Sequence, residues 1–230
     1  MLRERLEILR EKALLVDKLP GGLKSGPLER EYLELENMAK LNPEVGEELE
    51  EVYLLLIRAK FGKIQKFSFA GLLRNLLIAS ALASMVGCTI ILLIGIATGA
   101  LRYMAAPMMS AVIGVTSAIF CHELAHTLIA ERAFGIVGTV NVYTPIMIGL
   151  IPRVSEEIKA SPHMRLAAYT SGLIANLILS FLVLVPSKIF MAIGIVNMLV
   201  FITNLIPISR GLIMTDGRQI LREIEFLRGT

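Results

Sequence analysis

Apolar and charged residues follow two different patterns in the two parts of this chain. Over residues 1–66, charged and apolar residues are mixed. In residues 2–18 the apolar residues recur every three or four positions, which is the spacing of one helix face: Leu2, Leu6, Leu9, Ala13 and Val16. Residues 28–41 and 44–61 repeat this pattern after the breaker-rich loop 19–27. The pattern predicts an N-terminal charged helical domain over residues 1–66.

The second part of the chain, residues 67–230, contains long apolar runs with few or no charged residues. A helix needs about 20 mostly apolar residues to cross a bilayer. Four runs meet that length, at about 75–100, 105–131, 166–187 and 189–209. Composition agrees, since 55% of the residues are hydrophobic and the mean hydropathy is +0.68. We therefore predict an all-α polytopic membrane protein with four transmembrane helices.

A fifth uncharged run, residues 133–152, is not predicted to cross. It contains Gly135, Gly138 and Pro145, and its GTVNVYT stretch is rich in β-branched residues. If the run returns to its starting side, the basic residues of the flanking loops gather on one side: Arg58, Lys60, Lys63, Lys66, Arg74, Arg132, Arg153, Lys159, Arg165, Arg218 and Arg222. The opposite side then keeps Arg102 and Lys188. The positive-inside rule therefore predicts a re-entrant β-hairpin and cytosolic N- and C-termini.

Net charge and cysteines exclude two other classes of protein. A formal net charge of +3 is too small to indicate nucleic-acid binding, and the basic excess belongs to loops beside the apolar runs. Cys88 and Cys121 both lie inside apolar runs and form no disulfide framework. The expected partners are the lipid bilayer and other membrane proteins.

The segment HELAH, residues 122–126, is the strongest chemical signal. On a helix, His122 and His126 lie one turn apart, so their imidazoles converge on one metal ion. Glu123 lies about 100° around the helix, where it can take a proton from an attacking water. Placing two histidines and a glutamate inside a membrane helix is unfavourable by about several kcal/mol, so their presence there indicates a function. The pattern predicts one Zn²⁺ per chain.

Zinc requires a third protein ligand, and several residues are available. The HExxHxxGxxH pattern is excluded, because Ile129 and Arg132 occupy its additional positions. Asp216 is the best candidate, because it precedes a glycine, follows an apolar segment and leaves the site formally neutral together with Glu123. The other candidates are His163 and three glutamates near the predicted cytosolic surface: Glu131, Glu156 and Glu157.

Three motifs together resemble the site-2 protease family of intramembrane zinc metalloproteases. They are HELAH, SGLIAN at 171–176 and NLIP…DG at 204–217, and the resemblance covers about residues 75–220. It implies that His122, His126 and Asp216 bind zinc and that Glu123 is the general base. It also implies that Asn176 and Asn204 position the substrate or stabilise the oxyanion, although a helix–helix hydrogen bond is the simpler alternative for both. The hairpin would offer an edge strand to an unwound substrate.

Two features depart from the family pattern. Leu173 stands where the family usually has proline, and Asp216 follows Asn204 at a longer separation than is usual. The intervening ISRGLIM, residues 208–214, must therefore form a loop or an extra turn that returns the carboxylate to the metal.

The resulting expectation is hydrolysis of a peptide bond within or near a transmembrane segment of another protein. Two alternatives remain. One is a catalytically silent relative that binds membrane proteins, which the presence of Glu123 disfavours. The other is a membrane zinc peptidase of the prenyl-protein-processing type, which requires a downstream glutamate ligand, here Glu223 or Glu225.

Overall fold

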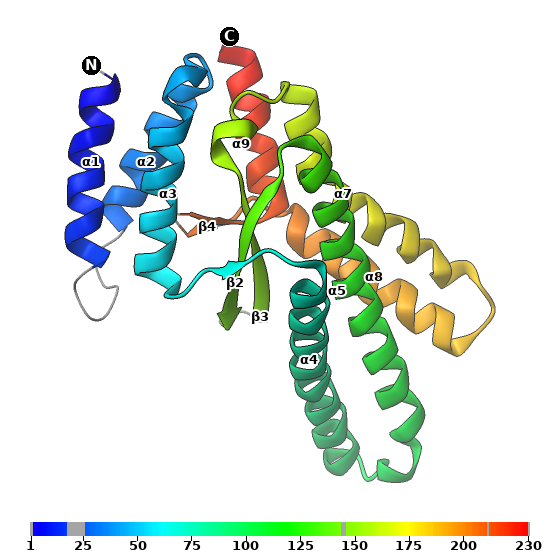
Figure 1. Ribbon diagram of the computed structural model, residues 1–230. Coiled ribbons are helices and arrows are strands. Elements are labelled where there is room, and N and C mark those ends of the chain that lie inside the picture. Colours follow the sequence, from blue (N-terminus) through cyan, green and yellow to red (C-terminus); the bar gives the residue numbers. More distant parts are fainter. Residues whose placement is uncertain (1, 18–25, 144–145, 211, 230) are drawn as a thin grey trace.

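The computed structural model describes residues 2–17, 26–143, 146–210 and 212–229. Four long helices, α4, α5, α7 and α8, form two antiparallel pairs, and the N-terminal helices and α9 gather at the other end of the molecule (Figure 1). A β-hairpin lies between the N-terminal helices and the helix pairs (Figure 1). The molecule is therefore mostly helical, with strands where the sequence predicted a hairpin.

The N-terminal region consists of three α-helices and a short 3₁₀ helix. They are α1 (Leu2–Asp17), α2 (Gly26–Ala39), η1 (Pro43–Val45) and α3 (Gly46–Phe61). All three predicted amphipathic helices form, and their apolar faces bury Leu9, Leu35 and Leu56 completely. Residue 18, the last of the first predicted helix, lies outside the described residues.

The N-terminal helices share a hydrophobic core with a segment far along the chain. Val154, the first residue of the short helix α6 (Val154–Glu157), and Ile158, which follows that helix, are buried in the same cluster as Leu9, Leu35 and Leu56. The Ser155 hydroxyl and backbone N–H also donate to Glu50 of α3, at 2.6 and 2.9 Å. Residues 1–66 are thus held against the second part of the chain by shared burial.

Within the described residues, four helical segments are long and apolar enough to cross a membrane. They are α4 (Phe69–Ala97), α5 (Ala105–Ala133), α7 with the 3₁₀ turn η3 (Pro162–Ser180 and Phe181–Leu184), and α8 (Lys188–Leu205). Large apolar side chains on them are exposed: Ile90, Leu93, Ile96, Phe181 and Ile202. A soluble monomer rarely exposes so much contiguous apolar surface, so these helices fit a lipid environment.

Helix ends differ from the predicted limits, for local reasons. Helix α4 begins at Phe69, six residues before the predicted limit of 75, because the Ser68 hydroxyl caps it by accepting from the Gly71 N–H. Ser161 caps α7 in the same way, with Pro162 at the first helical position. The predicted end of the last span at 209 was wrong, because α8 stops at Leu205, just before Pro207.

The hairpin lies where it was predicted, although its first residue differs. Strands β2 (Ile136–Tyr143) and β3 (Ile146–Pro152) pair antiparallel, and Ala133 still belongs to α5. A third strand, β1 (Gln65–Lys66), pairs with β2 and was not predicted. The hairpin packs on both sides, through Val140 and Ile151 against Ile57 of α3 and through Leu150 against Leu76 of α4.

A second small hairpin follows α8. Strands β4 (Ser209–Arg210) and β5 (Ile213–Met214) pair antiparallel, and α9 (Asp216–Gly229) begins two residues later. The Thr215 hydroxyl closes this turn by donating to the Ile206 carbonyl at 2.6 Å. The described part of the predicted loop 208–214 therefore contains two paired strands, and α9, which follows them, packs against α7 and α8.

Candidate metal centre

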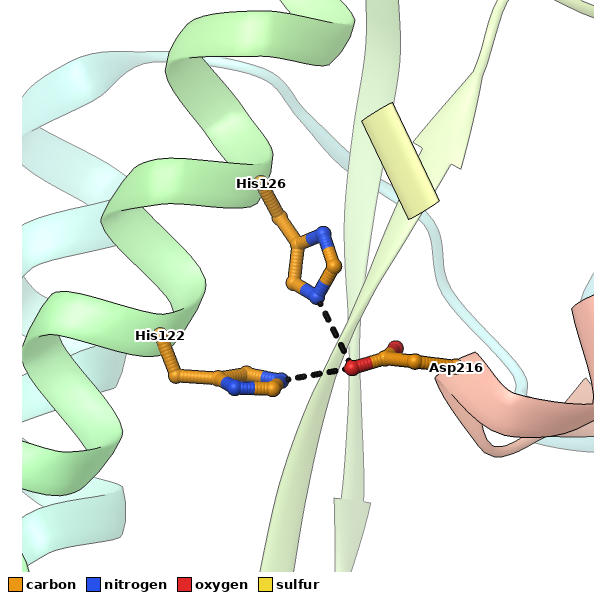
Figure 2. Close-up of side chains that lie close together, drawn as sticks. All are labelled: His122, His126 and Asp216. Carbon is orange, nitrogen blue, oxygen red and sulfur yellow. Dashed lines mark hydrogen bonds and ion pairs between the residues drawn. The ribbon is translucent and has the colours of Figure 1, made fainter. Parts of the chain in front are cut away.

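The HELAH segment presents its two histidines from one face of α5. The rings of His122 and His126 lie with their centroids 4.7 Å apart and almost perpendicular, at 79°. Asp216, the first residue of α9, points at both (Figure 2). Its Oδ2 lies 3.2 Å from Nε2 of His122 and 3.2 Å from Nε2 of His126. Within the described residues, His122, His126 and Asp216 form the group of side chains whose ligand atoms lie close enough together to hold a metal ion.

The geometry of these three donors fits a tetrahedral metal site. With bonds of about 2.0–2.2 Å to nitrogen and oxygen, two ligand atoms of a tetrahedron lie about 3.3–3.6 Å apart. The two Nε2–Oδ2 separations of 3.2 Å lie just below this range. Three protein ligands leave one tetrahedral position for water or substrate. Two imidazole nitrogens and one carboxylate oxygen are a donor set that zinc accepts.

Helix α7 packs against both histidines. The His126 Nδ1–H donates to the Ala168 carbonyl at 2.8 Å, which leaves Nε2, the nitrogen that faces Asp216, able to bind a metal. A Cβ on Gly172 would meet His126 Nε2 at 2.3 Å and His122 Cε1 at 2.8 Å. Only glycine lets α7 approach this closely. Sequence reasoning singled out the asparagine of SGLIAN and missed the role of this glycine in the same motif.

The two candidate asparagines are placed differently. Asn176 is fully buried on α7, and its Nδ2 lies 2.9 Å from Nδ1 of His122. Asn204 lines the cavity in front of the metal centre, and its Nδ2 donates to the Val200 carbonyl of its own helix. Asn204 is therefore at the wall of the cavity, whereas Asn176 contacts a histidine.

The start of α9 is held closely against the end of α8. A Cβ on Gly217 would meet the Leu205 carbonyl oxygen at 2.0 Å, so any larger residue there would displace the helix. Because Asp216 is the preceding residue, this contact sets the position of its carboxylate. The Asp-Gly pair thus combines a ligand with the close approach that places it.

Glu123 does not belong to the group of converging ligands. It lines a cavity of about 710 Å³ together with His122, His126 and Asp216. The far wall of this cavity comes from the N-terminal helices, through the stacked rings of Tyr32 and Tyr53. Glu123 thus faces the space in front of the metal centre, where a substrate and a water molecule can meet.

Several of the alternative ligands have other partners. Glu131 accepts from the Ile136 N–H at 2.8 Å at the entrance to the hairpin, and Glu156 pairs with Lys159. Glu157 accepts from the Tyr169 hydroxyl, and burial together with the charge of Glu36 raises the pKa of Glu157 to about 7. Neither these residues nor the exposed His163 belongs to the converging group.

Glu223, the ligand required by the prenyl-processing alternative, lies in a buried ion-pair cluster. Arg165 and Lys40 contact its two carboxylate oxygens at 2.5 and 2.9 Å. Burial acts to raise the pKa of Glu223, but these two cations hold it below its usual value. Glu223 therefore joins α9 to α7 and to Lys40, the residue that follows α2. Glu225 is half-exposed and paired with Arg218.

Known proteins provide no independent assignment of this site. A scan against models of protein families, a search of characterised proteins and a search of solved structures all found no match to this chain. The three converging side chains, the cavity beside them and the three short motifs therefore carry what can be inferred about function.

Proposed function

We propose that this chain is an intramembrane zinc metalloprotease of the site-2 protease type. The convergence of His122, His126 and Asp216 in front of Glu123 carries the proposal. His126 lies seven residues before the end of α5, so the site is about 10 Å inside that helix. The proposed substrate is a peptide bond within, or near the cytosolic end of, a transmembrane segment of another protein.

The residues of the site have distinct roles in this reaction. His122, His126 and Asp216 would hold zinc, which supplies Lewis-acid polarisation of the scissile carbonyl and of water. Glu123 takes a proton from the attacking water as its oxygen bonds to the carbonyl carbon. Glu123 then delivers that proton to the leaving amine nitrogen as the C–N bond breaks. Asn204, beside the cavity, is placed to bind the substrate backbone or the oxyanion.

A metal-binding site without catalysis is less well supported. Glu123 lines the cavity but is not one of the converging ligands. A catalytically silent relative would not need a carboxylate in that position. The prenyl-processing alternative is also disfavoured, since Glu223 is held by Arg165 and Lys40. No observation on the described residues favours either alternative.

The function is tested on the purified full chain in detergent or lipid. We expect one zinc per chain, cleavage of a model transmembrane substrate, and loss of both on treatment with a chelator, with recovery on adding zinc. Zinc binding without cleavage would support the silent alternative. Cleavage confined to prenylated C-terminal peptides would support the prenyl-processing one.

We further propose that both termini are cytosolic. The α4–α5 and α7–α8 turns, which carry Arg102 and Lys188, lie at the ends of the helix pairs away from the N-terminal helices (Figure 1). The basic residues 153, 159 and 165 follow the hairpin, on the side of the N-terminal helices. This distribution fits the positive-inside rule, with the N-terminal helices in the cytosol.

Cysteine labelling on intact cells tests this orientation. In a background with Cys88 and Cys121 replaced by serine, Arg102→Cys should react with an impermeant maleimide. Lys159→Cys should react only after the membrane is permeabilised. Lys159 is suitable because its side chain is half-exposed, whereas the neighbouring Ile158 is buried. Labelling of position 159 from outside would mean that residues 133–152 cross the membrane.

A further inference from the structure

The support of His122 differs from that of His126. His126 has a fixed backbone acceptor, the Ala168 carbonyl, at its Nδ1. The partner of His122 Nδ1 is a side-chain amide, Asn176, whose Nδ2 lies 2.9 Å away. Asn176 is fully buried and His122 nearly so. Water therefore cannot easily replace this contact, and the amide alone decides what His122 Nδ1 meets.

The chemistry of the imidazole determines which end of the amide is needed. A neutral histidine that binds a metal through Nε2 carries its hydrogen on Nδ1, and this N–H requires an acceptor. His122 directs Nε2 at Asp216, so its Nδ1 is the nitrogen with the hydrogen when the metal is bound. An amide nitrogen cannot accept that hydrogen, but an amide oxygen can.

The amide of Asn176 has an oxygen available for this purpose. Its Oδ1 is buried and has no hydrogen-bond partner within the described residues. Rotation of the amide by 180° exchanges Oδ1 and Nδ2 with little change in shape. After this rotation Oδ1 faces His122 Nδ1, and Nδ2 takes the buried position that Oδ1 holds in this structure.

We propose that Asn176 is a positioning residue whose Oδ1 accepts a hydrogen bond from His122 Nδ1–H and so keeps Nε2 available to the metal. This inference rests on the proposed metal site. It assigns Asn176 to holding a ligand, and leaves contact with the substrate to Asn204, which lines the cavity. The two histidines of HELAH are then held in the same tautomer by two different acceptors on α7.

Zinc affinity of the purified full chain, measured by competition with a chromophoric chelator, tests this role. Asn176→Leu should weaken zinc binding by about 10- to 100-fold, as the loss of an outer hydrogen-bond partner does elsewhere. Asn176→Asp should retain the affinity, because a carboxylate oxygen accepts the same hydrogen bond. Asn197→Leu is the matched control, since Asn197 is also fully buried in a long helix with an unpartnered Oδ1 and contacts Ser117 and the Ile193 carbonyl instead. It should bind zinc as the wild type does.

A second measurement separates hydrogen bonding from packing. The chain has three histidines, so ¹⁵N-histidine spectra of the zinc-loaded protein are simple, and His163→Gln identifies the third. His122 should show a protonated Nδ1 in the wild type and in Asn176→Asp. Unchanged affinity in Asn176→Leu, or an equal loss in Asn176→Asp, would overturn the role of Asn176. Failure of the wild type to bind zinc would instead reject the proposed function.

Discussion

Replacement of Glu123 by glutamine is expected to abolish cleavage of a transmembrane substrate while one zinc per chain stays bound. Glutamine has nearly the same shape, but it cannot take a proton from the attacking water. General acid–base catalysis contributes about 10²- to 10⁴-fold, and the reaction also requires protonation of the leaving amine, so activity should fall at least that far. Because Glu123 is not among the converging ligand atoms, the metal should remain. Cleavage rate and zinc content are measured on the same sample.

The matched control is Glu131→Gln, on the same helix. Glu131 accepts from the Ile136 N–H, and glutamine keeps an acceptor oxygen for this bond. The control therefore removes one negative charge from α5 without touching the metal centre, and it should retain activity. A Glu123→Gln variant that kept most of the activity would exclude Glu123 as the base. Loss of zinc in that variant would show that Glu123 is itself a ligand.

Replacement of Asp216 by asparagine should remove most of the zinc affinity and, with it, the activity. The Asp216 Oδ2 lies 3.2 Å from both histidine Nε2 atoms, so it is placed to be one of three metal ligands. A neutral amide is a poorer ligand and leaves a buried dication with one fewer negative charge. Since loss of an outer partner costs about 10- to 100-fold, loss of a ligand should exceed 100-fold. Zinc affinity is measured by chelator competition.

Glu225→Gln provides the control on the same helix. Glu225 is half-exposed on α9 and pairs with Arg218 of the same helix, so its replacement removes a charge from α9 without changing a proposed ligand. It should bind zinc like the wild type. Wild-type affinity in Asp216→Asn would point to another third ligand and would remove the main support for the site-2 protease assignment, although a metal site on His122 and His126 could survive.

Local sequence patterns predicted much of this structure, because they depend on residues close together in the chain. The i, i+4 spacing of His122 and His126 places both on one face of any α-helix, whatever surrounds it. Uncharged runs of about 20 residues predicted four long helices, and glycine, proline and β-branched residues distinguished the hairpin from a fifth. The limits were less accurate, because the predicted spans began just after Arg74 and Arg165, whereas capping by Ser68 and Ser161 starts both helices before these arginines.

The third ligand required the tertiary structure. Scarcity of aspartates and a family-like motif pointed to Asp216, but 90 residues separate it from His126. Its approach depends on the β4–β5 turn and on the contact of Gly217 with the Leu205 carbonyl. Neither feature produces a periodic pattern in the sequence, so only a folded chain could bring the carboxylate to the histidines.

The sequence by itself determined that this chain has long apolar helices and that one of them carries two histidines and a glutamate on adjacent faces. Only the tertiary structure decided what surrounds them. It joined Asp216 to the histidines, turned Asn176 to His122, brought Gly172 against both rings, and closed the cavity with Tyr32 and Tyr53. Periodicity shows which face of a helix is buried, but not which distant residue it meets, because that depends on how whole helices pack.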